Sequence, residues 1–196
     1  MTTTNTKASK GKSISLIPFS KAALNLQVKI LFEAQLKNSC LEVSFEIECE
    51  DMTTLDLPSV VEIPQRKMQL WESSCFEFFL KPTQKNCYWE FNLSPDRNWN
   101  CLKLNSYRNL EGEEAQVKLL DIQIEESSLN LFRLKVTFDL KTIPELYQTI
   151  QEDKQFKIGP AAILKTKKGR LTYWANSHSQ DEPDFHNKRN FAFWKL

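Results

Sequence analysis

The feature that most constrains the fold is a strict alternation of apolar and polar residues with a period of two. In the clearest stretch, residues 40–49, the apolar positions are Leu41, Val43, Phe45, Ile47 and Cys49. The positions between them hold Glu or Ser. Successive side chains of a strand point to opposite faces, so this stretch predicts a strand with one buried and one solvated face. The stretch from Leu24 to Phe32 repeats the pattern.

The same period continues along the chain. It predicts further strands at 75–80, 87–94, 99–107, 117–125, 128–139, 156–164, 170–175 and 190–195. A polar pair, Glu126-Ser127, separates two of these segments and predicts a hairpin. About ten short strands in one chain are typical of an all-β fold, and we expect an antiparallel β-sandwich.

One short helix is predicted after residue 142. Thr142 and Glu145 have the spacing of a capping box, with Pro144 in the first turn. Ile143, Leu146, Tyr147 and Ile150 then share one helical face. We expect this helix to close one end of the sandwich.

The domain organisation follows from composition along the chain. Residues 1–12 are rich in Thr, Ser and Lys, and we expect a flexible N-terminal tail there. The remainder, 13–196, has no repeat, no Pro/Ser linker and no shift in composition. We therefore predict a single domain over 13–196, a length that suits one sandwich.

Charge and glycine content exclude several classes of protein. The 26 Lys and Arg residues nearly balance 25 Asp and Glu, whereas a nucleic-acid-binding protein usually has a basic excess. With only 4 Gly, the chain has neither a Walker motif nor a dinucleotide-binding motif. No apolar stretch approaches about 18 residues, so we expect no membrane span.

The cysteines indicate the compartment. The five residues are an odd number and include no CxxC pair, so they predict neither a zinc site nor a full set of disulfides. No secretory signal is visible at the N-terminus. We expect a cytoplasmic protein with free, mostly buried thiols.

Two neighbouring strands carry polar groups on a shared pattern. In 75–80, Cys75, Glu77 and Phe79 lie opposite Phe76 and its apolar neighbours. In the next strand, Glu90 and Asn92 lie opposite the apolar positions. These groups could form a polar floor for a ligand. The alternative is a solvated face with surface ion pairs, because exposed charge requires no buried partner.

Two tryptophans lie near polar residues. Trp71 precedes the first of these strands, and Trp174 lies in the segment 171–178. Exposed indoles suit sugars, because the CH faces of a pyranose pack on aromatic rings. The alternative is that both rings belong to the core.

Catalytic and metal-binding patterns are weaker. Glu77 and Glu90 could act as the carboxyl pair of a glycoside hydrolase. Ser-His-Asp catalysis lacks a GxSxG motif. A metal site from His178, Asp184 and His186 matches no standard spacing, and a role for His186 in bridging its loop is the favoured interpretation.

Several segments together carry a family resemblance. They are 70–80, Tyr88 to Pro95, Trp99, Tyr107-Arg108, Tyr173 to Ala175 and Pro183 to His186. Their order and spacing resemble a group of uncharacterised bacterial DOMON-like proteins, which is akin to the family 9 carbohydrate-binding modules. The resemblance covers residues 13–196.

The resemblance implies a β-sandwich with a ligand site on one face. In the sugar-binding relatives two tryptophans clamp a sugar, and a Glu six residues after the first Trp bonds its hydroxyls. Trp71 and Glu77 keep that spacing, but Ser74 stands where the relatives have Asp. Trp174 would be the second clamp, with Asn176 as its polar neighbour.

Other DOMON relatives bind haem through a Met and a His. Met68 and His178 lie close in sequence to the two tryptophans, and haem binding by this pair is therefore the second hypothesis. No other cofactor is implied.

The combined prediction is non-catalytic binding of a small ligand, a carbohydrate or glycoside. Trp71 and Trp174 would stack on it. Hydrogen bonds would come from Glu77, Glu90, Asn92, Asn176 and His178. Arg108 would hold the carboxylates ionised. The sequence names no protein partner.

Overall fold

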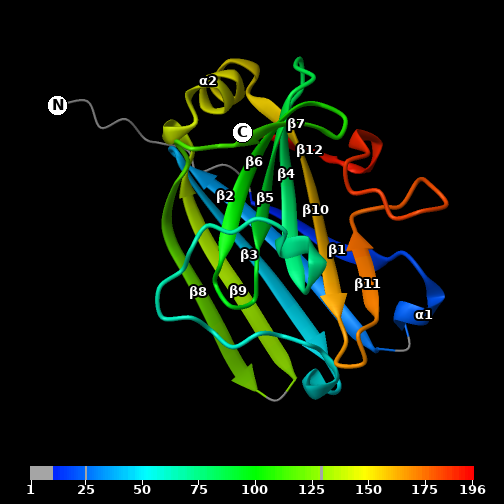
Figure 1. Cartoon of the computed structure of the whole chain (residues 1–196). Helices are drawn as coiled ribbons and strands as arrows, with labels where there is room; N and C mark the ends of the chain where they lie inside the picture. The colour runs from blue at the N-terminus through cyan, green and yellow to red at the C-terminus, as the bar shows by residue number, and fades with distance from the viewer. Residues whose placement is uncertain (1–10, 25, 129) are drawn as a thin grey trace.

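A computed structural model describes residues 11–24, 26–128 and 130–196 (Figure 1). Within these residues twelve strands follow one another: β1 (Lys12–Pro18), β2 (Val28–Lys37), β3 (Cys40–Cys49), β4 (Cys75–Pro82), β5 (Tyr88–Leu93), β6 (Trp99–Ser106), β7 (Asn109–Glu113), β8 (Lys118–Ser128), β9 (Leu131–Asp139), β10 (Gln155–Lys165), β11 (Leu171–Ala175) and β12 (Ala192–Lys195). The predicted tail lies outside the described residues up to position 10, and Lys12 already belongs to β1. The all-β prediction is confirmed.

The helices are short. They are α1 (Lys21–Leu24) and α2 (Pro144–Asp153), with single 3₁₀ turns at Met52–Thr54, Leu70–Glu72, Leu140–Thr142 and Lys188–Asn190. The early helix corrects the predicted strand at 24–32, which begins only at Val28. Gln27 adopts a positive φ of 49° just before that strand, so the backbone is not extended there.

Helix α2 lies where the sequence predicts it, but it has no capping box. Its N-cap is Ile143, and no side chain caps the first turn. Thr142 instead donates its hydroxyl to the carbonyl oxygen of Asp139, at 2.5 Å. Pro144 starts the helix and Leu146 and Ile150 bury its inner face, so packing rather than capping holds it.

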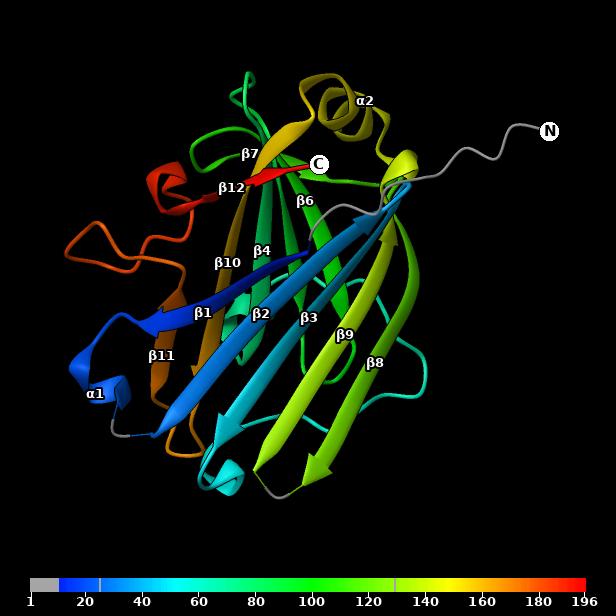
Figure 2. The ribbon, with the colours of Figure 1, turned by 180° about the vertical axis from the view of Figure 1, so that it is seen from behind.

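The strands form one antiparallel sheet that curls back on itself. Their order is β7-β6-β5-β4-β10-β11-β1-β2-β3-β9-β8, and β12 pairs with β10. β1 joins the two halves, because Ile14 pairs with Phe32 of β2 while Ile17 pairs with Ala175 of β11. Figure 2 shows β1, β2, β3, β9 and β8 across its near side. The hydrogen-bonded path is therefore continuous, where a sandwich has two separate sheets.

The main core fills the space between the two halves. Phe45 of β3 stacks on Phe76 of β4, with ring centroids 5.0 Å apart. Phe32 of β2 meets Phe78 of β4, with centroids 6.4 Å apart. All four rings are fully buried. The alternating apolar positions thus face inward, as the period of two predicts.

The outer face of β4, β5 and β6 is buried as well, against expectation. A second cluster there contains Phe79, Tyr88, Leu102, Leu104 and Phe191. The chain between β11 and β12, orange to red in Figure 1, contributes Phe191 to it. Gly159 of β10 permits this packing, because a Cβ there would lie 2.3 Å from Cδ1 of Phe191. This covering segment creates the enclosed surface on which the site lies.

Candidate functional site

A cavity of about 350 Å³ opens on the outer face of β4, β5 and β6. We call it the carboxyl pocket. It is lined by Trp71, Glu77, Glu90, Leu102, Leu104, Arg108, Leu110, Ile163, Tyr173, Pro183, Phe185 and His186. Strands supply its floor and the segment after β11 supplies one wall. Trp71, Glu77, Glu90 and Arg108 of the predicted set therefore lie together.

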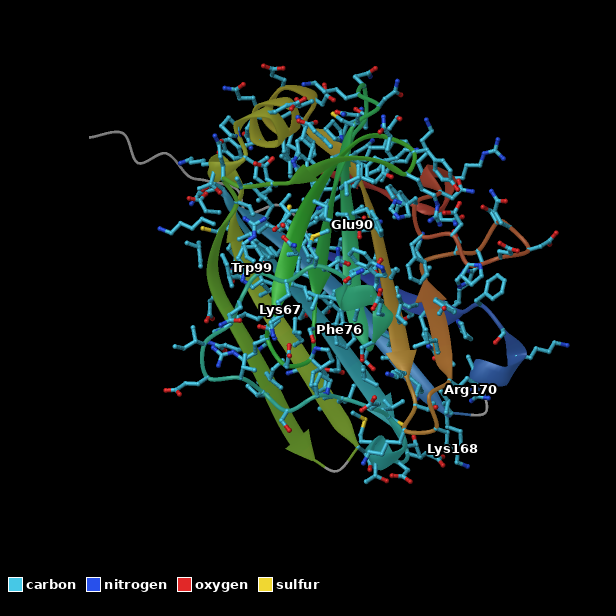
Figure 3. All side chains as sticks on the ribbon, viewed as in Figure 1. Lys67, Phe76, Glu90, Trp99, Lys168 and Arg170 are labelled. Carbon is cyan, nitrogen blue, oxygen red and sulfur yellow. The ribbon has the colours of Figure 1, made fainter. Side chains whose placement is uncertain are left out.

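The strand register explains why the two carboxyl groups meet. Glu77 pairs with Asn92 and Phe79 pairs with Glu90, so Glu77 and Glu90 are diagonal neighbours on one face. Glu90 belongs to β5 and Phe76 to the neighbouring β4, and both residues are labelled in Figure 3. Only 4% of Glu77 and 6% of Glu90 are exposed. The solvated-face alternative is wrong, because the C-terminal segment covers this face.

Glu77 is the least satisfied of these groups. Among the described residues, no donor forms a hydrogen bond with its side chain. Its carboxyl instead lines the pocket. Burial, and next the charge of Glu90, raise the pKa of Glu77 well above its usual value. No fully buried side-chain oxygen of the described residues lacks a hydrogen-bond partner, so the Glu77 carboxyl is open to the pocket, where a ligand can form a hydrogen bond with it.

Asn92 holds Glu90 in place and does not line the pocket. Its Nδ2 donates to Oε1 of Glu90 at 2.8 Å, and Asn92 is fully buried. Its Oδ1 lies 3.8 Å from the Cys75 sulfur, within reach of the thiol as donor. Asn92 therefore positions Glu90 rather than meeting a ligand, which corrects the predicted role.

His186 bridges the covering loop to the floor. Its Nδ1 lies 2.8 Å from the hydroxyl of Tyr88, which itself accepts from the backbone N–H of Arg108 at 3.1 Å. The Tyr88 hydroxyl thus links the ring of His186 to the backbone at Arg108. The Nε2 of His186 is 3.9 Å from Oε2 of Glu90. Burial, and next the charge of Arg108, lower the pKa of His186 to about 4.

Arg108 opposes the effect of burial on the carboxyl pair but does not outweigh it. Its guanidinium lowers the pKa of both Glu77 and Glu90, but burial outweighs it and raises both. Arg108 Nη2 donates to Oδ1 of Asp184 at 3.1 Å, so its charge is already paired. The sequence-based prediction took account of the charge of Arg108 but not of the desolvation that the cover over this face imposes.

Trp174 is not a clamp. It is 1% exposed and belongs to the main core, with Nε1 donating to the Thr172 hydroxyl at 3.0 Å. Its neighbour Tyr173 lines the pocket instead, because adjacent strand residues face opposite sides. The ring of Tyr173 contacts that of Phe185, with centroids 6.1 Å apart. Trp71, half-buried, also lines the pocket, and we call these three rings the aromatic wall.

The remaining predicted residues lie outside the pocket lining. Asn176 donates Nδ2 to the carbonyl of Asn190 at 2.8 Å. His178 Nε2 lies 2.9 Å from the carbonyl oxygen of Ile17. Met68 Sδ lies 3.2 Å from Nδ2 of Asn100. Met68 and His178 thus do not offer an axial haem pair at the pocket.

The described residues show no cluster of metal-ligating side chains and no disulfide. In the described part of the chain, no group of three or more His, Cys, Asp or Glu side chains could hold a metal ion. All five cysteines are free, and Cys49, Cys75 and Cys101 are buried. No helix of the described ranges is long and apolar enough to cross a membrane.

Sequence reasoning missed Tyr88, Tyr173, Phe185 and His186 as parts of this site. The alternation in β11 is the signal that separates Tyr173 from Trp174. No local signal predicts the bond between Tyr88 and His186, which are 98 residues apart.

Comparison with known proteins supports the fold. No protein-family model matches the chain, and no curated protein does. Among solved structures, the chain is similar to a "putative carbohydrate-binding protein" from Bacteroides uniformis, with a TM-score of 0.61 and 11% identity. The match covers 95% of this chain and 86% of the other. At this identity the likeness concerns the fold alone.

Proposed function

We propose that the protein binds a small polyhydroxylated ligand, a carbohydrate or glycoside, in the carboxyl pocket without catalysis. The observation that carries this proposal is the Glu77 carboxyl, which is 4% exposed, lines the pocket and has no hydrogen-bond donor among the described residues. A sugar hydroxyl both donates and accepts, so it suits a carboxyl group in either protonation state.

The rest of the lining supports the same ligand. The imidazole of His186 and the carboxyl of Glu90 add two more polar groups to the lining. Trp71, Tyr173 and Phe185 add apolar rings to the same lining. Pyranose rings present CH faces to aromatics and hydroxyls to polar groups. One aromatic wall would thus replace the expected pair of stacking tryptophans.

The comparisons agree with this proposal without establishing it. The fold neighbour carries the description of a carbohydrate-binding protein. The motifs around Trp71 and Glu77 resemble those of DOMON-like proteins and family 9 carbohydrate-binding modules. We therefore infer that the curled sheet is a variant of that β-sandwich.

The proposal is tested by titrating a panel of monosaccharides, disaccharides and alkyl glycosides into ¹⁵N-labelled protein. At least one saccharide should shift the Trp71 indole signal saturably. Glu77→Ala and Trp71→Ala should each weaken that binding by about tenfold or more, the cost of losing one well-packed contact. Glu152→Gln, an exposed carboxylate on α2, is the matched control and should change nothing. Saturable binding that survives both pocket variants would refute the proposal.

Glycoside hydrolysis is the second candidate, because Glu77 and Glu90 are neighbouring carboxyl groups in one pocket. Hydrolysis requires one carboxyl as acid and the other ionised as nucleophile or base. Burial raises the pKa of both, which disfavours the ionised partner. We expect no turnover of aryl glycosides. Cleavage that Glu77→Gln abolishes would replace the binding proposal.

A further inference from the structure

A second cavity, of about 520 Å³, adjoins the carboxyl pocket and differs from it in charge. We call it the lysine cavity. It is lined by Lys81, Asn86, Tyr88, Ser106, Tyr107, Gln180, His186, Asn187, Lys188 and Arg189. His186 lines both cavities. None of the residues that line the lysine cavity carries a carboxylate.

The positive charges here are unpaired. Among the described residues, Lys81, Lys188 and Arg189 form no ion pair with a carboxylate. Lys81 is 6% exposed, and two of its N–H groups donate to the backbone carbonyls of Pro82 and Lys85. An ammonium has three donors, so one remains for another acceptor.

The strand register brings a further cation to the same place. Lys81 of β4 pairs directly with Lys157 of β10, and like charges at opposite positions destabilise a sheet. Burial, and next the charges of Lys188 and Lys157, lower the pKa of Lys81. Lys157 lies over the ring of Phe193, whose centroid is 4.6 Å from its Nζ, and forms no ion pair with a carboxylate of the described residues. A bound anion would relieve this repulsion.

We propose that the lysine cavity binds a small oxyanion, a phosphate, sulfate or carboxylate group, held by Lys81, Lys188 and Arg189. The hydroxyl and amide groups of Ser106, Asn86 and Gln180 supply further neutral donors in the lining. Charge-assisted hydrogen bonds to an oxyanion are the strong kind, which suits a cavity that concentrates cations. This proposal is independent of the carbohydrate proposal, because Lys81, Lys188 and Arg189 do not line the carboxyl pocket.

The test is a titration of ¹⁵N-labelled full-length protein with inorganic phosphate and with sulfate, at constant ionic strength kept with sodium chloride. The backbone amide signals of Lys188 and Arg189 should move saturably. Lys188→Ala and Arg189→Ala should each raise the apparent Kd about tenfold, the effect of losing one charge-assisted hydrogen bond. Both side chains are exposed, so the fold should survive, and a thermal melt checks this.

Lys168→Ala is the matched control, because it removes an exposed lysine from the β10–β11 turn. Its phosphate affinity should equal that of the wild type. The proposal is overturned by an absence of saturable shifts in the wild type, or by equal weakening in Lys168→Ala and Lys188→Ala. The second result would mean that binding follows overall charge.

The anion could be free in solution or part of a larger ligand that also enters the carboxyl pocket, and a titration with glucose 6-phosphate distinguishes these two sources. Tighter binding than inorganic phosphate, with shifts at the Trp71 indole, would assign the anion to a ligand that spans both cavities. Equal affinity would assign a free anion. Phosphate binding in a protein that binds no saccharide would support this site and refute the carbohydrate proposal, so the two can fail separately.

Discussion

Replacing Trp174 by Ala should cost far more stability than replacing Trp71. Trp174 is 1% exposed and lies in the main core. A buried Trp removes about 150–250 Å² from water, which at about 25 cal/mol per Å² is about 4–6 kcal/mol. Measured truncations of large core aromatics cost about 3–5 kcal/mol. We therefore expect a loss of about 4–5 kcal/mol in the free energy of unfolding.

The matched variant is Trp71→Ala, which truncates the half-buried ring at the pocket. It packs only partly against the second cluster, so a loss of about 1–2 kcal/mol is expected. Urea unfolding followed by far-UV circular dichroism at pH 7 measures both, without relying on the fluorescence that the variants remove. Equal losses in the two variants would contradict the placement of Trp174 in the core and of Trp71 at the pocket.

Three further predictions concern the groups around the pocket. Burial, and next the charge of Glu90, raise the pKa of Glu77 above 4.5, so the folded state binds the carboxyl proton more tightly than the unfolded state does. The free energy of unfolding should therefore fall as the pH rises above about 4.5. Glu77→Gln should reduce this fall in urea titrations, and an identical slope would count against the buried carboxyl. Burial, and next the charge of Arg108, lower the pKa of His186 from 6.5 to about 4. The neutral ring therefore contributes about 3 kcal/mol to the free energy of unfolding above pH 6.5, and this contribution is lost as the pH falls towards 4. An NMR titration of the imidazole checks this value, and a midpoint near 6.5 would be inconsistent with it. Gly159→Ala should cost about 1–3 kcal/mol in thermal or urea unfolding, because its Cβ would lie 2.3 Å from Phe191 Cδ1, and an unchanged stability would refute this packing.

The strands and their inward faces could be predicted because they depend on local alternation. Phe76 and Phe78 face the core and Glu77 faces away, as a period of two requires. The strands that escaped prediction have weaker patterns. β7 is an edge strand with mostly exposed residues, and β1 begins at Lys12, the last residue of the segment expected to be a tail.

The site could be predicted only in part because its cover comes from distant sequence. Glu77 and Glu90 follow from the pattern of two adjoining strands. Their burial depends on the segment that brings His186 to Tyr88, and the pattern of apolar and polar residues does not predict that contact. The same desolvation outweighs the effect of Arg108 on the pKa values of Glu77 and Glu90. The prediction that Trp174 stacks on a ligand was wrong because it rested on residue type, which does not determine the face of the strand to which a ring points.

The most direct test of the central claim is a crystal structure with the saccharide that binds most tightly in the panel. A sugar hydroxyl should lie within hydrogen-bond distance, about 2.5–3.0 Å, of the Glu77 carboxyl. A ring face of the sugar should contact Trp71, Tyr173 or Phe185. A saccharide bound elsewhere, such as on the outer face of β2, β3 and β9, with the carboxyl pocket empty, would contradict the account.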